Sequence, residues 1–514
     1  MPRKLLSVAA ILFLFFLNQA KAQKPFFFEK ASPEAEGVSS QGIMDFLNAA
    51  SKSKHEFHSI IFLRHGRAIA EGWWNPYRKD LTHTMYSCSK SFTATAVGFA
   101  VSEKLLNVND KVISFFPNEL PDTVSKYLSE LTVKDVLMMS DGQEPDPTGN
   151  VVVNENWVKA FLALQILHEP GTVFLYNSAG TYMLSAIVQK VTGKKVIDYL
   201  KPRLFDPLGI EGIDWETDPH GINTGGWGLR LKTEDMAKFG QLFLQKGKWN
   251  GKQILTEEWV NEASTVKIIQ HPDYPQAKKD SSDWEQGYCY QMWRCRHNAF
   301  RGDGAFGQYI IVMPEEDAVI AITSETADMQ GELDLVWKYL LPAMHKEKLP
   351  ENKSASVKLQ EQLASLALPE LKKNDIKSSD IKIEGKIFSF EPNKKNLQSA
   401  TFRFNNNICE LTLKTDTAEY ILNFGAGKWL LGETKRHGPY LVAAAQSNLT
   451  GLPPFKIAGE YAWKNENTLE LDLRYIQSPH TEKIICIFNE KNIELGFEKS
   501  FSTDKDVVKG VLQE

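Results

Sequence analysis

The chain has 514 residues, more than one compact core usually holds, so at least two domains are expected. Its composition is that of a globular protein, with 42% hydrophobic and 24% charged residues and a formal net charge of -5. Because the charge is negative and no run of five or more basic residues is present, nucleic acid is not expected as a partner.

The first residues have the features of a secretory signal. A basic pair at 3–4 precedes an apolar stretch at 5–17, and the small residues of "AKA" at 20–22 suit a cleavage site. The apolar stretch is too short for a membrane-spanning helix, which needs roughly 20 residues. We therefore predict a signal peptide at 1–22, export to the periplasm or the cell exterior, and no membrane span after cleavage.

The elements expected next alternate in type along the chain. A helix is expected at 40–50, a hairpin that turns at His65-Gly66, and a long buried helix at 87–106. Helical spacing then recurs at 133–139, 155–167, 181–191 and 233–246, and strand patterns follow at 287–295, 306–314 and 317–324. A sheet built from both ends of this segment, with helices inserted between them, is an α+β arrangement. We predict one such domain at 23–345.

A change of composition indicates a second domain. Residues 346–380 are polar and rich in lysine, with one short helical segment, so we interpret them as a linker. Beyond them, alternating apolar and polar residues predict short strands at 381–391, 400–406, 408–414, 418–425, 468–475, 482–488 and 493–498. The segment 381–514 is therefore expected to be a smaller all-β accessory domain, either a sandwich or a small barrel.

The cysteine and histidine patterns predict neither a disulfide framework nor a metal site. Five cysteines are few for an exported chain of this length. Cys289 and Cys295 could form a local bridge, or both could be small buried residues. The sequence contains no CxxC, HExxH or clustered histidines, so we expect no metal and no cofactor.

The stretch "MYSCSKSFTATAVGF" at 85–99 holds the strongest candidates for chemistry. Lys90 follows Ser87 by three residues, so the two side chains share one face of a helix. A serine hydroxyl attacks only when a base takes its proton, and a lysine can be that base only when its pKa is depressed, for example by burial.

The spacing alone is weak evidence, because the alternative is an ordinary hydroxyl at the start of a helix. Ser-x-x-Lys occurs five times in this chain, beginning at Ser51, Ser87, Ser264, Ser379 and Ser502. Only the pattern at Ser87 opens a long apolar helix, which would bury the lysine. This context favours Ser87 as a nucleophile.

The stretch "SCSKSFTATAVGFAVSEKLLNVNDKV" resembles the active-site helix of the serine β-lactamase and penicillin-binding-protein superfamily. The resemblance is strongest to the class C-type branch, which includes esterases, D-amino acid peptidases and 6-aminohexanoate-dimer hydrolases. "LTVKDVLMMSDG", "EPGTVFLYNSAGTYMLSAIVQKVTG" and "LRLKTEDMAKFGQLFLQKGKWNGKQILTEEWV" resemble later segments in the family order, so the matches span roughly 31–344. The resemblance implies a β-lactamase-like fold and acyl-serine chemistry. Ser87 would attack, Lys90 would accept its proton, and Tyr176 would pass a proton to the leaving group.

Two departures from the family motifs bear on the substrate. The second motif is usually Tyr-x-Asn, whereas this chain has Tyr176-Asn177-Ser178, so either Ser178 or Asn177 would contact substrate. The third motif, usually Lys-Thr-Gly or His-x-Gly, aligns with a Gly-Asp-Gly sequence at 302–304. Asp303 then stands where a cation would fix a carboxylate, which favours neutral or even basic substrates over β-lactams and peptides with a C-terminal carboxylate.

The same alignment suggests an oxyanion hole. The backbone N–H groups of Ser87, at the helix start, and Ala305, just after the third motif, are the expected donors. Asp303 and Gly304 would line the substrate site beside them. Trp227 and Trp293 could also form walls of the cleft, although places in the core are equally compatible with the sequence. The alternative for the "GDGAFG" stretch is a simple glycine-rich turn.

The leading hypothesis is an exported serine hydrolase that acts on an ester or amide in a small molecule or peptide. Within enzymes, the alternative is a cell-wall D-amino acid peptidase or a weak β-lactamase. A third possibility is a penicillin-binding-like module that binds ligands without turnover. The presence of Ser87, Lys90 and Tyr176 counts against this last possibility, but the altered third motif keeps it open. The sequence leaves the oligomeric state open.

Overall fold

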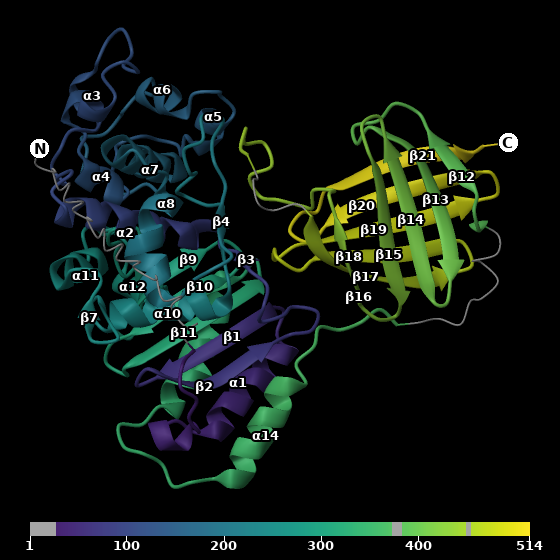
Figure 1. Cartoon of the computed structure of the whole chain (residues 1–514), viewed down its shortest axis with the longest axis horizontal. Helices are drawn as coiled ribbons and strands as arrows, with labels where there is room; N and C mark the ends of the chain where they lie inside the picture. Colours follow the sequence, from purple (N-terminus) through teal and green to yellow (C-terminus); the bar gives the residue numbers. More distant parts are fainter. Residues whose placement is uncertain (1–26, 373–382, 449–453, 514) are drawn as a thin grey trace, which may run out of the picture.

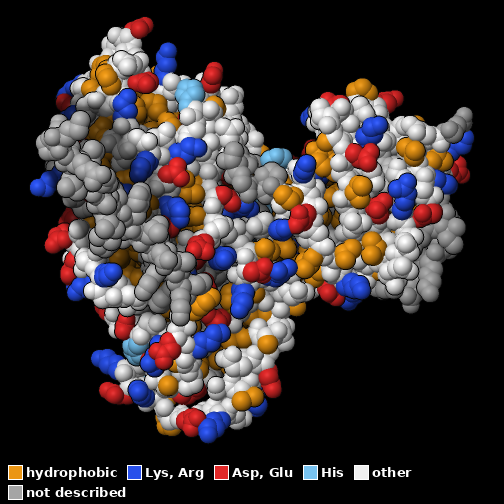
Figure 2. All heavy atoms as spheres, in the orientation of Figure 1, with side chains coloured by type: hydrophobic (Ala, Val, Ile, Leu, Met, Phe, Trp, Pro, Cys, Tyr) orange, Lys and Arg blue, Asp and Glu red, His pale blue; other side chains and the backbone are white. Residues whose placement is uncertain are grey.

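The computed structural model describes residues 27–372, 383–448 and 454–513, which form an α+β domain and a C-terminal β-barrel (Figure 1). The predicted signal peptide at 1–22 lies outside these ranges. Within them, no helix has the length and apolar character needed to cross a membrane. Lysine, arginine and acidic side chains are interspersed over the face shown in Figure 2.

An antiparallel sheet with the strand order β2-β1-β11-β10-β9-β8 forms the centre of the first domain. Its strands come from the two ends of the domain, as the sequence predicts. They are β1 (Glu56–Arg64), β2 (Arg67–Trp73), β8 (Trp293–Arg294), β9 (Phe300–Gly304), β10 (Gln308–Met313) and β11 (Ala318–Glu325). Two small sheets accompany it, formed by β3 (His83–Thr84), β4 (Asp214–Trp215) and β5 (Leu229–Leu231), and by β6 (Lys248–Trp249) and β7 (Lys252–Gln253).

Helices cover both faces of this sheet, and alternate strand residues serve two separate cores. Ile310 and Val312 face a core shared with α2, α7 and α10, whereas Tyr309 and Ile311 face a core shared with α1, α13 and α14. The helices are α1 (Ser40–Lys52), α2 (Ser89–Ser102), α3 (Lys126–Glu130), α4 (Val133–Leu137), α5 (Thr148–Val152), α6 (Trp157–Leu162), α7 (Ser178–Thr192), α8 (Val196–Leu200), α9 (Asp206–Leu208), α10 (Thr233–Leu244), α11 (Glu257–Ser264), α12 (Gln276–Asp280), α13 (Met329–Leu335) and α14 (Lys353–Ala364).

The apolar helix that carries the Ser-x-x-Lys pattern begins two residues later than the sequence suggests. The short 3-10 turn η2 (Tyr86–Cys88) precedes α2, so Ser87 lies on the turn and Lys90 on the helix. The helix ends at Ser102, and Lys104 takes a left-handed conformation with φ 59°. Twelve consecutive residues of α2, from Ser89 to Ala100, are buried, so this part of the helix has no solvent-facing side and its polar side chains are buried with the apolar ones.

The segment predicted as a linker includes helix α14, which lies beside α1 on the outer face of the sheet (Figure 1). Leu359 and Leu363 of this helix are buried in the same core as α1 and β1. Further along, the backbone N–H of Leu371 donates to Glu460 of the barrel at 2.9 Å. Part of the segment between the domains is thus packed against both.

The C-terminal domain is a barrel rather than a sandwich. Its sheet has the order β15-β14-β13-β12-β21-β20-β19-β18-β17-β16, and a parallel pairing of β15 with β17 closes nine of these strands into a ring. The strands are β12 (Ile387–Phe390), β13 (Leu397–Asn405), β14 (Ile408–Thr415), β15 (Glu419–Ala426), β16 (Leu430–Thr434), β17 (Phe455–Asn465), β18 (Thr468–Tyr475), β19 (Thr481–Asn489), β20 (Asn492–Lys499) and β21 (Lys505–Leu512). Alternate residues such as Leu411 and Leu413 fill the interior.

Candidate active site

Ser87 lies on η2, where the chain turns sharply into α2. The preceding residue, Tyr86, has φ 43°, a conformation that L-residues rarely adopt. Ser89 fixes the turn, because its hydroxyl donates to the carbonyl of Tyr86 at 2.6 Å and accepts from the N–H of Leu229 at 3.2 Å. The turn leaves the Ser87 side chain partly exposed at the edge of a cleft.

Lys90 is buried and directed at Ser87. Its Nζ lies 3.0 Å from Ser87 Oγ and donates to Ser178 Oγ and to the carbonyl of Gly226, each at 2.8 Å. Burial lowers the pKa of Lys90 to about 7, although Asp146 acts in the opposite direction. At neutral pH a substantial fraction of Lys90 is therefore an uncharged amine that can accept a proton from Ser87.

Tyr176 completes the group on the other side of Ser87. Its ring stacks on Trp293, with centroids 5.6 Å apart, and Lys90 Nζ lies 4.8 Å from the Tyr176 ring centroid. Burial raises the pKa of Tyr176 well above its usual value, and a hydrogen bond with Ser87 opposes part of this rise. The phenol therefore stays protonated in the resting site, where it can donate a proton.

The two residues after Tyr176 have different places. Ser178 contacts Lys90, as described above, whereas Asn177 is fully buried and caps α7 by accepting from the N–H of Gly180. The Asn177 amide also donates to Asp141 at 2.9 Å and to Gln143 at 2.6 Å. The expectation that Asn177 contacts substrate is therefore corrected, because its side chain is committed to the core.

The two expected oxyanion donors belong to segments that meet beside the cleft. Ser87 and Ala305 both line it. Between these segments, a Cβ on Gly304 would lie 2.3 Å from the carbonyl oxygen of Met85, so only glycine lets the end of β9 approach the turn this closely. Gly304 thus acts by close approach of its backbone rather than by lining the cleft.

The cleft has a volume of about 600 Å³, within the usual range for small-molecule sites. Aromatic rings form one side and the start of α13 forms another. Its lining residues are Ser87, Tyr176, Trp284, Trp293, Asp303, Ala305, Ala327, Asp328, Met329 and Gln330. Among the lining residues that the structure describes, two are carboxylates and none is a lysine or an arginine.

Asp303 does line the cleft, but it does not present an isolated negative charge. The Nε and Nη2 atoms of Arg301 both lie 2.7 Å from Asp303 Oδ2. Arg301 itself is fully buried, with its guanidinium 4.3 Å from the ring of Trp284. Asp303 is therefore a paired carboxylate at the cleft rather than a lone charge. Residues two apart on a strand share a face, and this rule could have predicted the partner.

Tryptophans wall the cleft, but Trp227 is not one of them. Trp227 is buried in the core, where it stacks on Trp157 with centroids 5.7 Å apart. Trp293, the other candidate, does line the cleft, and Trp284 lines it as well. Nothing in the local sequence distinguishes these three residues, because their exposure depends on how distant segments pack.

The cysteines and the histidines form no further site within the described residues. The five cysteines, including Cys289 and Cys295, are buried thiols, and no disulfide joins these two. Cys295 Sγ instead accepts from Nη1 of Arg301 at 3.1 Å. No cluster of three histidine, cysteine, aspartate or glutamate side chains in the described ranges is arranged to hold a metal ion.

The chain is similar to several known proteins. The family model described as Beta-lactamase matches residues 58–342. A 6-aminohexanoate-dimer hydrolase of Paenarthrobacter ureafaciens is 26% identical over 292 residues, 52% of this chain and 73% of that protein. An N-acetylmuramyl-L-alanine amidase of Bacillus subtilis (strain 168) is 26% identical over 179 residues, 30% of this chain and 41% of that protein. A solved structure of a candidate 6-aminohexanoate-dimer hydrolase from Bacillus anthracis has a TM-score of 0.52 at 21% identity, covering 63% of this chain and 89% of that one.

Proposed function

Because the chain belongs to the Beta-lactamase family of serine hydrolases, we propose that it cleaves an ester or amide through an acyl intermediate on Ser87. The observation that supports this proposal most directly is the contact of Lys90 with Ser87. Their side chains are 3.0 Å apart, and burial lowers the pKa of the lysine to about 7. A nucleophile and a base in hydrogen-bond contact are the elements that acyl transfer requires.

In the first half of the reaction, Ser87 Oγ attacks the substrate carbonyl carbon while its proton passes to Lys90 Nζ. The carbonyl becomes a tetrahedral oxyanion, which the N–H groups of Ser87 and Ala305 stabilise. Tyr176, whose phenol is protonated, donates to the departing alcohol or amine and regains its proton through Lys90. In the second half, water attacks the acyl-serine, and the same groups return the proton to Ser87 Oγ.

The cleft favours neutral or cationic substrates. Asp303 on the cleft wall is already paired with the buried Arg301, and Asp328 is paired with Lys54. The described lining residues therefore include no lysine or arginine that could bind a substrate carboxylate. The rings of Trp284 and Trp293 offer an apolar surface for an acyl or leaving group. β-Lactams and peptides with a free C-terminus carry a carboxylate, so turnover of these substrates should be slower than turnover of uncharged esters or amides.

The test of the proposal is covalent labelling. We expect a fluorophosphonate to add one label per chain, located at Ser87 by peptide mass spectrometry, and we expect Ser87→Ala to lose both the label and hydrolysis of p-nitrophenyl esters. Ser51→Ala is a matched control, since Ser51 opens another Ser-x-x-Lys pattern on an exposed part of α1. Retention of a tenth of the wild-type rate in Ser87→Ala would contradict the assignment.

We also propose that the protein is exported after removal of residues 1–22. The support is the composition of this segment, which lies outside the described residues. Mass spectrometry of protein recovered from cells should show a mature chain that begins at Gln23. A chain that retains residues 1–22 in the recovered active fraction would contradict export by cleavage.

A further inference from the structure

A buried histidine of the C-terminal barrel domain contacts the active-site turn. His480 follows β18 and precedes β19, and its side chain is fully buried against the first domain. His480 Nε2 is 2.6 Å from the hydroxyl of Tyr86, and His480 Nδ1 is 2.6 Å from Glu325 Oε1. Glu325 can accept a hydrogen bond from Nδ1–H, which leaves Nε2 as the acceptor for the Tyr86 hydroxyl.

The same imidazole also contacts the second segment of the expected oxyanion hole. The ring of Phe306 meets the ring of His480 edge to face, with centroids 4.8 Å apart. Tyr86 directly precedes Ser87, and Phe306 directly follows Ala305. One side chain of the barrel therefore contacts a neighbour of each proposed N–H donor.

Both of these neighbours have backbone conformations that require support. Tyr86 has φ 43° and Phe306 has φ 67°, in the left-handed region that bulky residues rarely adopt. Such conformations cost free energy and persist only where the surrounding structure holds them. Here the two rings contact each other as well as His480, with centroids 5.7 Å apart.

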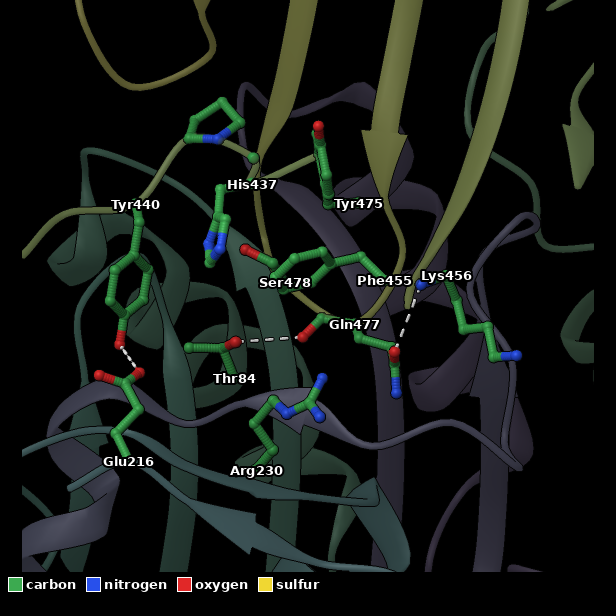
Figure 3. Close-up of a pocket in the computed structure, with 12 residues that line it drawn as sticks. Thr84, Glu216, Arg230, His437, Tyr440, Phe455, Lys456, Tyr475, Gln477 and Ser478 are labelled. Atoms are coloured by element: carbon green, nitrogen blue, oxygen red, sulfur yellow. Dashed lines mark hydrogen bonds between the residues drawn. The ribbon is translucent and has the colours of Figure 1, made fainter. Parts of the chain in front are cut away.

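A second barrel residue supports Tyr86 from another side. The ring of Tyr440 stacks on that of Tyr86, with centroids 5.6 Å apart and an interplanar angle of 22°. Tyr440 is itself held by a hydrogen bond to Glu216 of the first domain, as Figure 3 shows. The neighbouring cavity between the domains has a volume of about 50 Å³, room for a few water molecules only.

We propose that the barrel completes the active site, with His480 as a positioning residue that holds the backbone of Tyr86 and Phe306 so that both oxyanion donors point into the cleft. His480 does not touch the substrate in this arrangement and acts only through its two neighbours. The inference rests on the proposed role of Ser87 as the nucleophile. It assigns to the accessory domain a function in catalysis rather than in attachment alone.

The predicted signature is a loss of kcat without a loss of substrate binding. Oxyanion donors stabilise the transition state more than the bound substrate, so their displacement lowers kcat and leaves KM nearly unchanged. For His480→Ala we expect kcat on a p-nitrophenyl ester to fall by roughly 10- to 100-fold. Complete removal of one oxyanion donor lowers kcat by roughly 10² to 10³, and a displaced donor should cost no more than that. KM should change by less than about twofold.

Two further variants separate positioning from simple contact between domains. Tyr86→Phe keeps the ring and removes the hydroxyl that contacts His480, so it should also lower kcat. This variant tests the same contact if His480→Ala fails to fold. Combined with His480→Ala, it should add little further loss, because His480→Ala already removes the partner of the Tyr86 hydroxyl. Gln477→Ala removes a 3.2 Å hydrogen bond to Thr82 elsewhere in the same interface and should leave kcat unchanged.

The outcomes distinguish the two proposals. If Ser87→Ala loses activity but folded His480→Ala and Tyr86→Phe retain the wild-type kcat, the positioning role is wrong and the proposed function stands. If Gln477→Ala lowers kcat as much as His480→Ala, the interface as a whole matters and His480 has no special role. Retained activity in Ser87→Ala would overturn the proposed function itself.

Discussion

Lys90 determines how activity should depend on pH. Burial lowers its pKa from 10.5 to about 7, and only the neutral amine can accept the proton of Ser87. We therefore expect kcat/KM to rise with pH up to about 7 and to level off above it, falling about tenfold per pH unit on the acid side. Steady-state rates on a neutral ester between pH 5 and 9 measure this profile.

Substitution of the base provides the control for that profile. Lys90→Met should lower the rate by roughly 10² to 10⁴, and the remaining activity should lose its inflection near pH 7. If Lys90→Met keeps both the rate and the inflection, another group accepts the proton of Ser87.

The charge of the cleft can be tested at Ala327, an exposed lining residue beside Asp328. Ala327→Lys adds a cation to the cleft wall, where it could pair with a carboxylate on the substrate. Because exposed ion pairs are weak, we expect kcat/KM for a carboxylate-bearing ester to rise by roughly two- to fivefold relative to kcat/KM for a neutral ester of equal length. Ala327→Gln has similar length without the charge and should not change the ratio. An equal change in both variants would mean that length, not charge, is responsible.

For single residues, the sequence predicts burial best where the residue belongs to an apolar helix. The apolar run after Ser87 predicts that Lys90 is buried, and the structure places the two in contact. The positions of Asn177 and Trp227 could not be predicted in the same way. Their surroundings come from segments distant in the sequence, and the same residue types suit a cleft or a core.

Helix α14 shows that an element can be recognised while its role is not. The sequence predicts a short helical segment in a polar linker, but Leu359 on this helix is fully buried against the first domain. Leu359→Ala should lower the free energy of unfolding by about 2–5 kcal/mol, as for other buried leucines. Val357→Ala, at a position on the same helix that is 56% exposed, should change it by less than about 0.5 kcal/mol. Urea denaturation measures both, and similar values for the two would mean that α14 is not packed on the domain.

Among the strands, period-two alternation identified most of the barrel, including β14, β18 and β19. It missed β16, β17 and β21. In β17, seven consecutive residues are buried, so its sequence does not alternate in the way that a half-exposed strand does. Closure of the ring depends on the pairing of β15 with β17, which no single strand encodes, so the sequence left barrel and sandwich as alternatives.

For the whole molecule, the contact between the domains should weaken in acid. Glu56 of β1 pairs with Arg474 of the barrel, and although burial raises the pKa of Glu56, Arg474 and His58 lower it to about 2. A carboxyl with a depressed pKa stabilises the folded state above its ordinary pKa of 4.5 and loses that contribution as pH falls towards 2. We therefore expect the two domains to unfold in a single transition near neutral pH and in two separate transitions as the pH falls through this range.

Differential scanning calorimetry between pH 5 and 2.5 would follow this separation. Glu56→Gln should show the weakened contact already at neutral pH and a smaller dependence on acid. If wild type and Glu56→Gln respond equally to pH, this ion pair does not couple the domains. Contacts between the domains join residues far apart in the chain and could not be predicted from one sequence. Tyr86 and His480, for example, are 394 positions apart.

The distribution of the buried cysteines gives each domain its own chemical reporter. Cys88, Cys289 and Cys295 lie in the first domain, and Cys409 and Cys486 lie in the barrel. A buried thiol reacts with an alkylating reagent only when the structure around it opens. Brief exposure to iodoacetamide, followed by peptide mass spectrometry, would therefore record how often each domain opens, within one intact molecule and without any engineered cysteine.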